Sequence, residues 1–333
     1  MIHPIPPGTR DVLPEEMREL RHLENAILDV FDERGYGLVS TPTIEYEEVL
    51  ARGSSQVAAA AYKLFDPDGA VLSVRTDMTV PIARLVASRY DDAEQPLRLC
   101  YSAAAMRMIR PQRGQQREFT QIGVELLGAP APEGTAEVVD VLVAALDAAG
   151  LRRARIGLGD ADLFRSLLDD VQVGGEARDR VLSRLVMHDF VGLEREVAAL
   201  DIGDAECEAL TRLPRLRGGA ELLDQARATG VPAVDRALER LKTTLEALDR
   251  RGVSDRIIID LGLLRDLGYY SGAILEVYDP AIGHVLGGGG RYDELLGRFG
   301  HPMPAAGFAL QLDRLHVAAV EEERLRTAGE HAS

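Results

Sequence analysis

The chain has 333 residues, 46% of them hydrophobic and 28% charged, which is enough for a large buried core in one big domain or two smaller ones. Its formal net charge of −16 disfavours extended nucleic-acid binding, because neutralising phosphates requires clustered Lys and Arg. Cys100 and Cys207 belong to no CxxC pair, so neither a zinc site nor a disulfide framework is predicted. The sequence has no signal segment and no run of about 18 apolar residues, which favours a cytoplasmic protein without membrane contact.

The first half of the chain alternates between helix and strand patterns. Apolar residues recur at helical spacing between residues 17 and 31, which predicts a helix that Gly35 ends. The tetrapeptide DPDG at 66–69 is a strong turn signal between two apolar runs and therefore predicts a β-hairpin. The other elements predicted up to residue 158 are strands at 37–41, 63–65, 70–75, 97–108, 118–126 and 155–158, and helices at 80–89 and 136–149.

The pattern changes in the second half of the chain. Apolar residues follow helical spacing from about 177 to 250, which predicts an all-helical insertion. Strands are predicted at 256–261, 273–278 and 306–312, and helices near 292–298 and from 313 to about 326. We therefore expect an α+β fold in which residues 1–176 and 251–333 form a strand-rich core and residues 177–250 form the insertion.

Two short segments before residue 118 carry side chains that suit a charged ligand. Asp77 and Thr79 are two residues apart, so on an extended chain both side chains point to the same side and could accept bonds from an ammonium group. The alternative is an N-cap for the helix that follows. Residues 107–117 hold four arginines, whose guanidinium groups suit phosphate or carboxylate. The alternative for this stretch is a solvated hairpin loop paired with acidic neighbours.

Three further segments are candidates for a site, the first of them only if its polar face lines a cleft. The strand around residues 121–125 places Gln121, Gly123 and Glu125 on one polar face. The segments 265–272 and 287–293 are rich in Gly and Tyr, and glycine lets a ligand or another backbone approach closely. The glycine tract is no dinucleotide fingerprint, and its alternative is a strained turn without a ligand. The seven histidines show neither HxxxH nor HExxH spacing, so no metal site and no catalytic residue are predicted.

Taken in order, these segments resemble the signature motifs of histidyl-tRNA synthetase, and the resemblance covers essentially the whole chain. It implies the catalytic-core fold of a class II aminoacyl-tRNA synthetase, an antiparallel sheet flanked by helices, and dimerisation through the first motif. The segments that carry it are 6–14, the first motif ending at Pro42, 75–79, the second motif with its loop at 107–125, 265–270, 289–293 and the third motif at 307–315.

The chain departs from the synthetase pattern where ATP would bind. Ile109 stands where the family has an acid, and isoleucine can neither accept a bond from adenine nor hold magnesium. Asp266 beside Arg265 would weaken the attraction of that arginine for a phosphate, and Gln311 replaces a glycine. Nineteen residues follow Arg314, whereas the synthetases carry an anticodon-binding domain of roughly a hundred residues. We therefore expect no anticodon-binding domain and no tRNA substrate.

The amino-acid half of the site is retained in this comparison. The resemblance implies a histidine pocket with acceptors for an ammonium or an imidazole N–H, an arginine for a carboxylate, and aromatic walls. The implied histidine-binding residues are Asp77, Thr79, Arg107, Gln121, Glu125, Tyr269, Tyr270 and Tyr292, and the degenerate nucleotide side comprises Ile109, Arg117, Arg265 and Arg314.

A synthetase core that lacks the anticodon domain but keeps a histidine pocket resembles the regulatory subunits of ATP phosphoribosyltransferase. That resemblance implies a non-catalytic subunit that has no cofactor. A short catalytic subunit would require it for activity in the first step of histidine biosynthesis. The resemblance also implies a homodimer within a hetero-octamer, and L-histidine as the inhibiting ligand. The alternative is an enzyme that forms an aminoacyl adenylate on a free amino acid or a protein, since Arg107, Arg265 and Arg314 survive.

Overall fold

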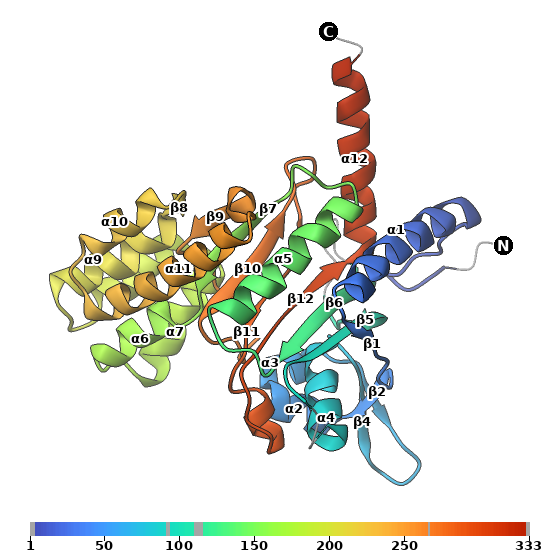
Figure 1. The fold of residues 1–333 in the computed structure, drawn as a ribbon. Helices are drawn as coiled ribbons and strands as arrows, with labels where there is room; N and C mark the ends of the chain where they lie inside the picture. The colour runs from blue at the N-terminus through green and yellow to red at the C-terminus, as the bar shows by residue number, and fades with distance from the viewer. Residues whose placement is uncertain (1–3, 91–93, 110–115, 266, 331–333) are drawn as a thin grey trace.

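The computed structural model describes residues 4–90, 94–109, 116–265 and 267–330. Nine strands of these ranges form one sheet, which is antiparallel except at its β1–β5 and β7–β9 pairs (Figure 1). The predicted α+β class is confirmed. In sheet order the strands are β1 (Gly37–Leu38), β5 (Leu97–Met106), β6 (Glu118–Leu127), β12 (Ala305–Gln311), β11 (Val285–Arg291), β10 (Ala273–Tyr278), β7 (Arg155–Asp160), β9 (Ile257–Asp260) and β8 (Arg217–Gly218).

Helix α5 (Glu133–Ala148) crosses one face of this sheet (Figure 1). Ten of its residues are buried, because α5 packs on β6 and β12 and is flanked by helix α1 (Pro14–Glu33) and by residues 232–250. The buried side chains of α1 are spaced as an amphipathic stripe requires, at Leu20, Leu23, Ile27 and Phe31. The helices predicted at these places are confirmed. Helix α12 (Leu312–Glu330) leaves the end of β12 and projects from the body.

The predicted hairpin is confirmed and belongs to a second, three-stranded sheet. Strands β3 (Lys63–Phe65) and β4 (Val71–Val74) flank the turn, in which Gly69 N–H donates to the Asp66 carbonyl at 2.9 Å. Gly69 has φ +89°, a conformation that glycine adopts without strain. Strand β2 (Ile44–Tyr46) pairs with β4, and α2 (Glu47–Gly53), α3 (Ser55–Ala59) and α4 (Thr79–Arg89) complete this part.

The segment 177–250 is mostly helical, as predicted, but not entirely. Strand β8 pairs antiparallel with β9, so the segment adds an edge strand to the main sheet. Its apolar side chains join the same hydrophobic core as those of α5 and β7. Helix α6 (Leu163–Asp170) precedes the segment, and η2 (Ser254–Arg256) follows it. The helices of the segment are α7 (Gly175–Val186), α8 (Phe190–Ala198), α9 (Asp204–Arg212), η1 (Leu213–Arg215), α10 (Glu221–Arg227) and α11 (Pro232–Arg250).

Two predicted elements are wrong or shorter than expected. The helix near 292–298 is absent from the described residues, and only the short 3₁₀ turn η3 (Leu296–Phe299) occurs there, ended by Gly300 at φ +87°. The strand at 37–41 is reduced to the two residues of β1, although Val39 N–H still donates to the Cys100 carbonyl.

The glycine tract lies in a central strand and not in a turn. Strand β11 runs between β10 and β12, and its glycines leave no room for side chains. A Cβ at Gly287 would overlap the Ala309 carbonyl oxygen, and one at Gly289 would overlap the Gly307 carbonyl oxygen. The tract therefore gives the sheet a bare patch on which other groups can lie.

Within the described ranges, no helix combines the length and apolar character that crossing a bilayer requires.

Candidate functional site

A cavity lies over this bare patch. Arg265 and seven of the eight residues predicted to bind histidine line it. They come from the start of α4, the end of β5, strand β6 and the two tyrosine-rich segments, so the fold brings together residues far apart in the sequence. The seven are Asp77, Thr79, Arg107, Gln121, Tyr269, Tyr270 and Tyr292.

Asp77 supports the start of α4, which is one of the two roles that the sequence left open. Its Oδ1 accepts a bond from the Val80 N–H at 3.2 Å, so it binds the first turn of α4. Its Oδ2 is buried without a hydrogen-bond partner among the described residues. Burial raises the pKa of Asp77, and the charge of Arg107 and the N–H groups of Val80 and Thr79 oppose that shift.

Three lining side chains each present a buried polar atom with no hydrogen-bond partner among the described residues. These atoms are two acceptors, Asp77 Oδ2 and Gln121 Oε1, and one donor, Arg265 Nη1. Each unpaired buried group costs about 1–3 kcal/mol. The cavity is therefore complementary to a small ligand that offers two donors and a negatively charged or polar acceptor.

Glu125 lies one layer behind the cavity. Its Oε1 accepts a bond from the Thr79 hydroxyl at 2.9 Å, and its Oε2 accepts one from the Tyr292 hydroxyl. Only 2% of Glu125 is exposed, and burial raises its pKa to about 8, although both hydroxyls oppose that shift. Its role in this geometry is to position Thr79 and Tyr292.

Glu125 should make stability depend on pH. Its pKa lies near 8 in the folded chain against 4.5 for an ordinary glutamate, so the folded state holds the proton more tightly. Its contribution is fully present below pH 4.5 and is lost as pH rises towards 8. We expect the free energy of unfolding of the wild type, relative to Glu125→Gln, to fall by a few kcal/mol across this interval.

Urea unfolding at several pH values measures this difference. Glu48→Gln, which removes an exposed carboxyl from α2, is the matched control and should show no such trend. A difference between wild type and Glu125→Gln that stays constant with pH would contradict the burial argument.

Three tyrosines form one wall of the cavity. The rings of Tyr269 and Tyr270 lie 4.9 Å apart between centroids, and Tyr269 meets Tyr292 edge to face at 5.9 Å. Arg165 of α6 fixes this wall by donating a bond to the Tyr270 carbonyl at 3.0 Å. Aromatic rings with polar ends suit a flat, partly polar ligand group.

Arg107 and Arg265 give the cavity positive charge. Arg107 donates to the Thr76 carbonyl at 3.2 Å, and its guanidinium lies 5.0 Å from the centre of the Phe119 ring. Burial lowers the pKa of Arg107, and Asp77 opposes that shift. The guanidinium of Arg265 lies against β11 at Gly288. A side chain at that position would not fit, since its Cβ would overlap Arg265 Nη1.

The other residues expected on the nucleotide side lie outside the cavity lining. Arg117 donates to the Ile109 carbonyl at 2.9 Å. Arg314 donates to the Val285 carbonyl at 2.5 Å, and burial lowers its pKa. Gln311 does line the cavity, from the end of β12. The loop residues 110–115 and Asp266 lie outside the described residues.

The comparisons with known proteins agree with this architecture. Residues 8–315 match the family model described as Histidyl-tRNA synthetase. An ATP phosphoribosyltransferase regulatory subunit of Moorella thermoacetica is 42% identical over 327 residues, which cover 98% of this chain and 84% of that protein. The chain belongs to the family of ATP phosphoribosyltransferase regulatory subunits. A member from Symbiobacterium thermophilum is 41% identical over 325 residues, 96% of this chain and 81% of its own length.

Solved structures confirm the class II core that the motifs predicted for this family. An ATP phosphoribosyltransferase regulatory subunit/histidyl-tRNA synthetase of Bacillus halodurans superposes with a TM-score of 0.86 at 36% identity, over 96% of this chain and 84% of that one. Histidyl-tRNA synthetase from Nostoc, at 22% identity, has a TM-score of 0.76 over 99% of this chain and 76% of that one. That last likeness concerns the fold alone.

Several residues of the site were not predicted from the sequence of this regulatory subunit. Gly307 and Ala309 of β12 line the cavity, and their small size opposite the glycine tract was the available signal. Arg165 gave no signal, because it reaches the tyrosine wall from α6 by a long-range contact. In the part of the chain that the structure describes, no three His, Cys, Asp or Glu side chains gather as metal ligands would.

Proposed function

We propose that the chain is a regulatory subunit that binds L-histidine in this cavity and activates a short catalytic subunit of ATP phosphoribosyltransferase, at the first step of histidine biosynthesis. The observation that carries the proposal is the set of three buried atoms on Asp77, Gln121 and Arg265 that have no partner in the described part of the chain. Histidine offers an ammonium, an imidazole N–H and a carboxylate, and these match two acceptors and one donor. The family's printed name supports the regulatory role.

In the proposed complex each charged group of histidine meets an opposite charge or a matching bond partner. Asp77 receives the ammonium group, and Arg265 with Arg107 receives the carboxylate, as charge-assisted bonds require. Gln121 accepts the imidazole N–H, and the tyrosine wall covers the ring. Glu125 contributes by holding Thr79 and Tyr292 in place.

Feedback then requires that histidine binds one quaternary state better than another. A ligand moves such an equilibrium only by its difference in affinity for the two states. Because β11, β12 and the tyrosine wall all line the cavity, a small displacement of that wall would change the contacts that histidine makes.

A reconstitution assay tests this function. The purified chain alone should form no phosphoribosyl-ATP, and mixing it with a short catalytic subunit should raise the activity of that subunit. Added L-histidine should then suppress the activity. If the mixture is no more active than the catalytic subunit alone, the proposal is wrong.

An adenylate-forming enzyme is the second candidate, and the surviving arginines of the cavity favour it. Arg107 and Arg265 carry positive charge where a phosphate could bind. An ATP–pyrophosphate exchange assay with histidine separates the two functions. Robust exchange supports the enzyme, whereas the regulatory proposal expects none.

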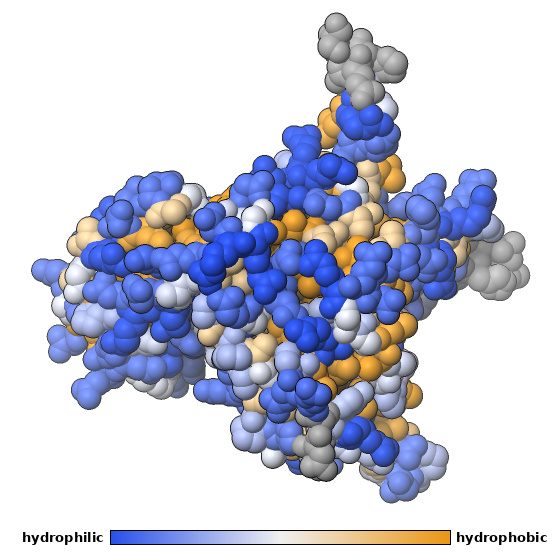
Figure 2. Space-filling view, viewed as in Figure 1, coloured by the Kyte–Doolittle hydropathy of each residue, from blue (hydrophilic) through white to orange (hydrophobic). Residues whose placement is uncertain are grey.

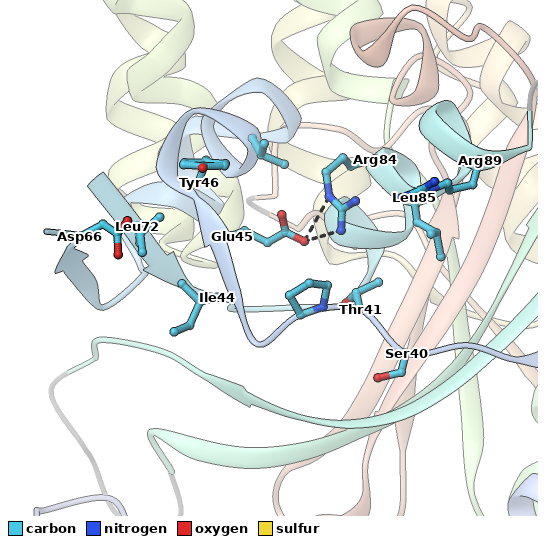
Figure 3. Close-up of a pocket in the computed structure, with 12 residues that line it drawn as sticks. Ser40, Thr41, Ile44, Glu45, Tyr46, Asp66, Leu72, Arg84, Leu85 and Arg89 are labelled. Carbon is cyan, nitrogen blue, oxygen red and sulfur yellow. Dashed lines mark hydrogen bonds and ion pairs between the residues drawn. The ribbon is translucent and has the colours of Figure 1, made fainter. Parts of the chain in front are cut away.

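We also infer that a second copy of the chain covers the small sheet, as a homodimer within a hetero-octamer. Cross-strand register places Ile44, Tyr46 and Leu64 on one face, with exposed fractions of 44%, 54% and 41%. A pocket beside this face is lined by Ser40, Pro42 and Leu85, with Glu45 and Arg84 paired at 2.7 Å (Figure 3). Figure 2 shows hydrophobic surface at the lower right, where Figure 1 places β1, β2 and β4.

Tyr46→Asp should therefore break the homodimer. A carboxylate at the centre of an apolar interface would be buried without a partner, which opposes association. Light scattering after gel filtration measures the mass, and we expect the wild type at twice the mass of the variant. The control is Val191→Asp on α8, which changes a side chain that is 61% exposed but belongs to another surface. Equal masses for Tyr46→Asp and wild type would exclude this interface.

A further inference from the structure

A separate groove of about 440 Å³ lies between helix α7 of the insertion and the residues just before the tyrosine wall. Its apolar part consists of Leu182 and Val186 from α7, Met187 just after α7, and Leu264 from the core. Arg165 and Arg265 supply positive charge, Asp179 of α7 supplies one carboxylate, and Ser183 of α7 is exposed. None of these groups except Arg265 lines the ligand cavity.

The pairing of the two arginines in this groove is known for the described residues, which leave out Asp266. Arg165 donates to the Tyr270 carbonyl, and Arg265 Nη1 has no partner among the described residues. Neither forms an ion pair with any carboxylate that the structure describes. In a chain with a net charge of −16, most of the surface repels an acidic partner. In this groove two guanidinium groups without an ion pair among the described residues outnumber the one carboxylate of Asp179, so the groove would fix where such a partner binds.

We propose that this groove receives a segment of the catalytic partner that carries a carboxylate next to an apolar side chain. The carboxylate pairs with Arg165 and Arg265, and the apolar side chain covers Leu182, Val186 and Leu264. This inference rests on the proposed function and names the surface that function uses. A nucleic acid fits less well, because two guanidinium groups neutralise few phosphates and the rest of the chain is acidic.

Arg265 connects this groove to the ligand cavity, because it lines both. A carboxylate in the groove and the carboxylate of a ligand in the cavity compete for one guanidinium group. Binding at either place therefore weakens binding at the other, and the two effects must be equal in free energy. Histidine should thus lower the affinity of the partner segment for the groove, which provides a direct route for inhibition.

The test replaces Ser183, which is exposed and lies outside the ligand cavity. Ser183→Asp places a carboxylate beside the two arginines and should raise the Kd for the short catalytic subunit about tenfold. Ser183→Lys adds positive charge and should leave that Kd unchanged or lower it. Gln225→Asp on α10 carries the same charge change away from the groove and should stay within about twofold of the wild type. Circular dichroism confirms that each variant is folded.

The outcomes separate this inference from the proposed function. If Ser183→Asp binds the catalytic subunit as tightly as Gln225→Asp does, the groove assignment is overturned. If the wild type itself does not bind the catalytic subunit, the proposed function fails and the groove proposal fails with it. If Ser183→Asp instead abolishes binding of a single-stranded RNA and leaves the catalytic subunit bound, the groove belongs to a nucleic acid and the inference is wrong.

Discussion

Replacing Gly307 by alanine is expected to cost about 3 kcal/mol of unfolding free energy and to abolish histidine binding. A Cβ at this position would overlap Glu125 Oε2 and lie 2.5 Å from the Val124 carbonyl oxygen. Neither can move easily, because Val124 is in the central strand β6 and Glu125 is held by Thr79 and Tyr292. Urea unfolding and a histidine titration measure the two effects.

Gly283→Ala is the matched control for this prediction. Gly283 lies in the turn between β10 and β11, and a Cβ there would meet no atom within 4 Å. The control should unfold within about 0.5 kcal/mol of the wild type. Should Gly307→Ala prove as stable as Gly283→Ala, the close packing of β12 against Glu125 is incorrect.

The second large effect concerns Asp77. Asp77→Asn keeps an oxygen that can accept the Val80 N–H but loses the negative charge that the proposed ammonium group meets. Removing one charge-assisted bond should weaken histidine binding about a hundredfold. Since a ligand at a hundred times its Kd stabilises the folded state by about 2.7 kcal/mol, histidine should raise the Tm of the wild type but hardly that of the variant.

Two comparisons make this result specific. Without histidine, the variant should be as stable as the wild type or more stable, because burial already disfavours the charged form of Asp77. Asp66→Asn, which changes the exposed tip of the hairpin, should leave the histidine-dependent shift in Tm intact. If histidine raises the Tm of Asp77→Asn as much as that of the wild type, the ammonium group, or the whole ligand, binds elsewhere.

Local patterns were sufficient for most of the fold. The stripe from Leu20 to Phe31 defined α1, and the turn at 66–69 defined the hairpin, because both signals depend on neighbouring residues alone. The glycine tract could not be assigned in this way. Its residues fit a turn or a strand equally well, and only the contact with β12 makes it a central strand.

The candidate site shows the same division between local and long-range information. The sequence predicted the polar face of β6. It did not predict that Gln121 lines the cavity while Glu125 lies behind Thr79. Likewise, motif order identified Arg117 and Arg314 but could not reveal that each donates to a backbone carbonyl outside the cavity lining. Such partners come from residues distant in sequence or from backbone atoms that carry no signature.

Calorimetric titration of L-histidine into the purified chain, with no nucleotide present, tests the central claim most directly. We predict saturable binding of one histidine per chain, since Asp77, Gln121 and Arg265 line the cavity and each has a buried polar atom without a partner among the described residues. The account is contradicted if no heat of binding is detected, or if histidine binds only after ATP is added.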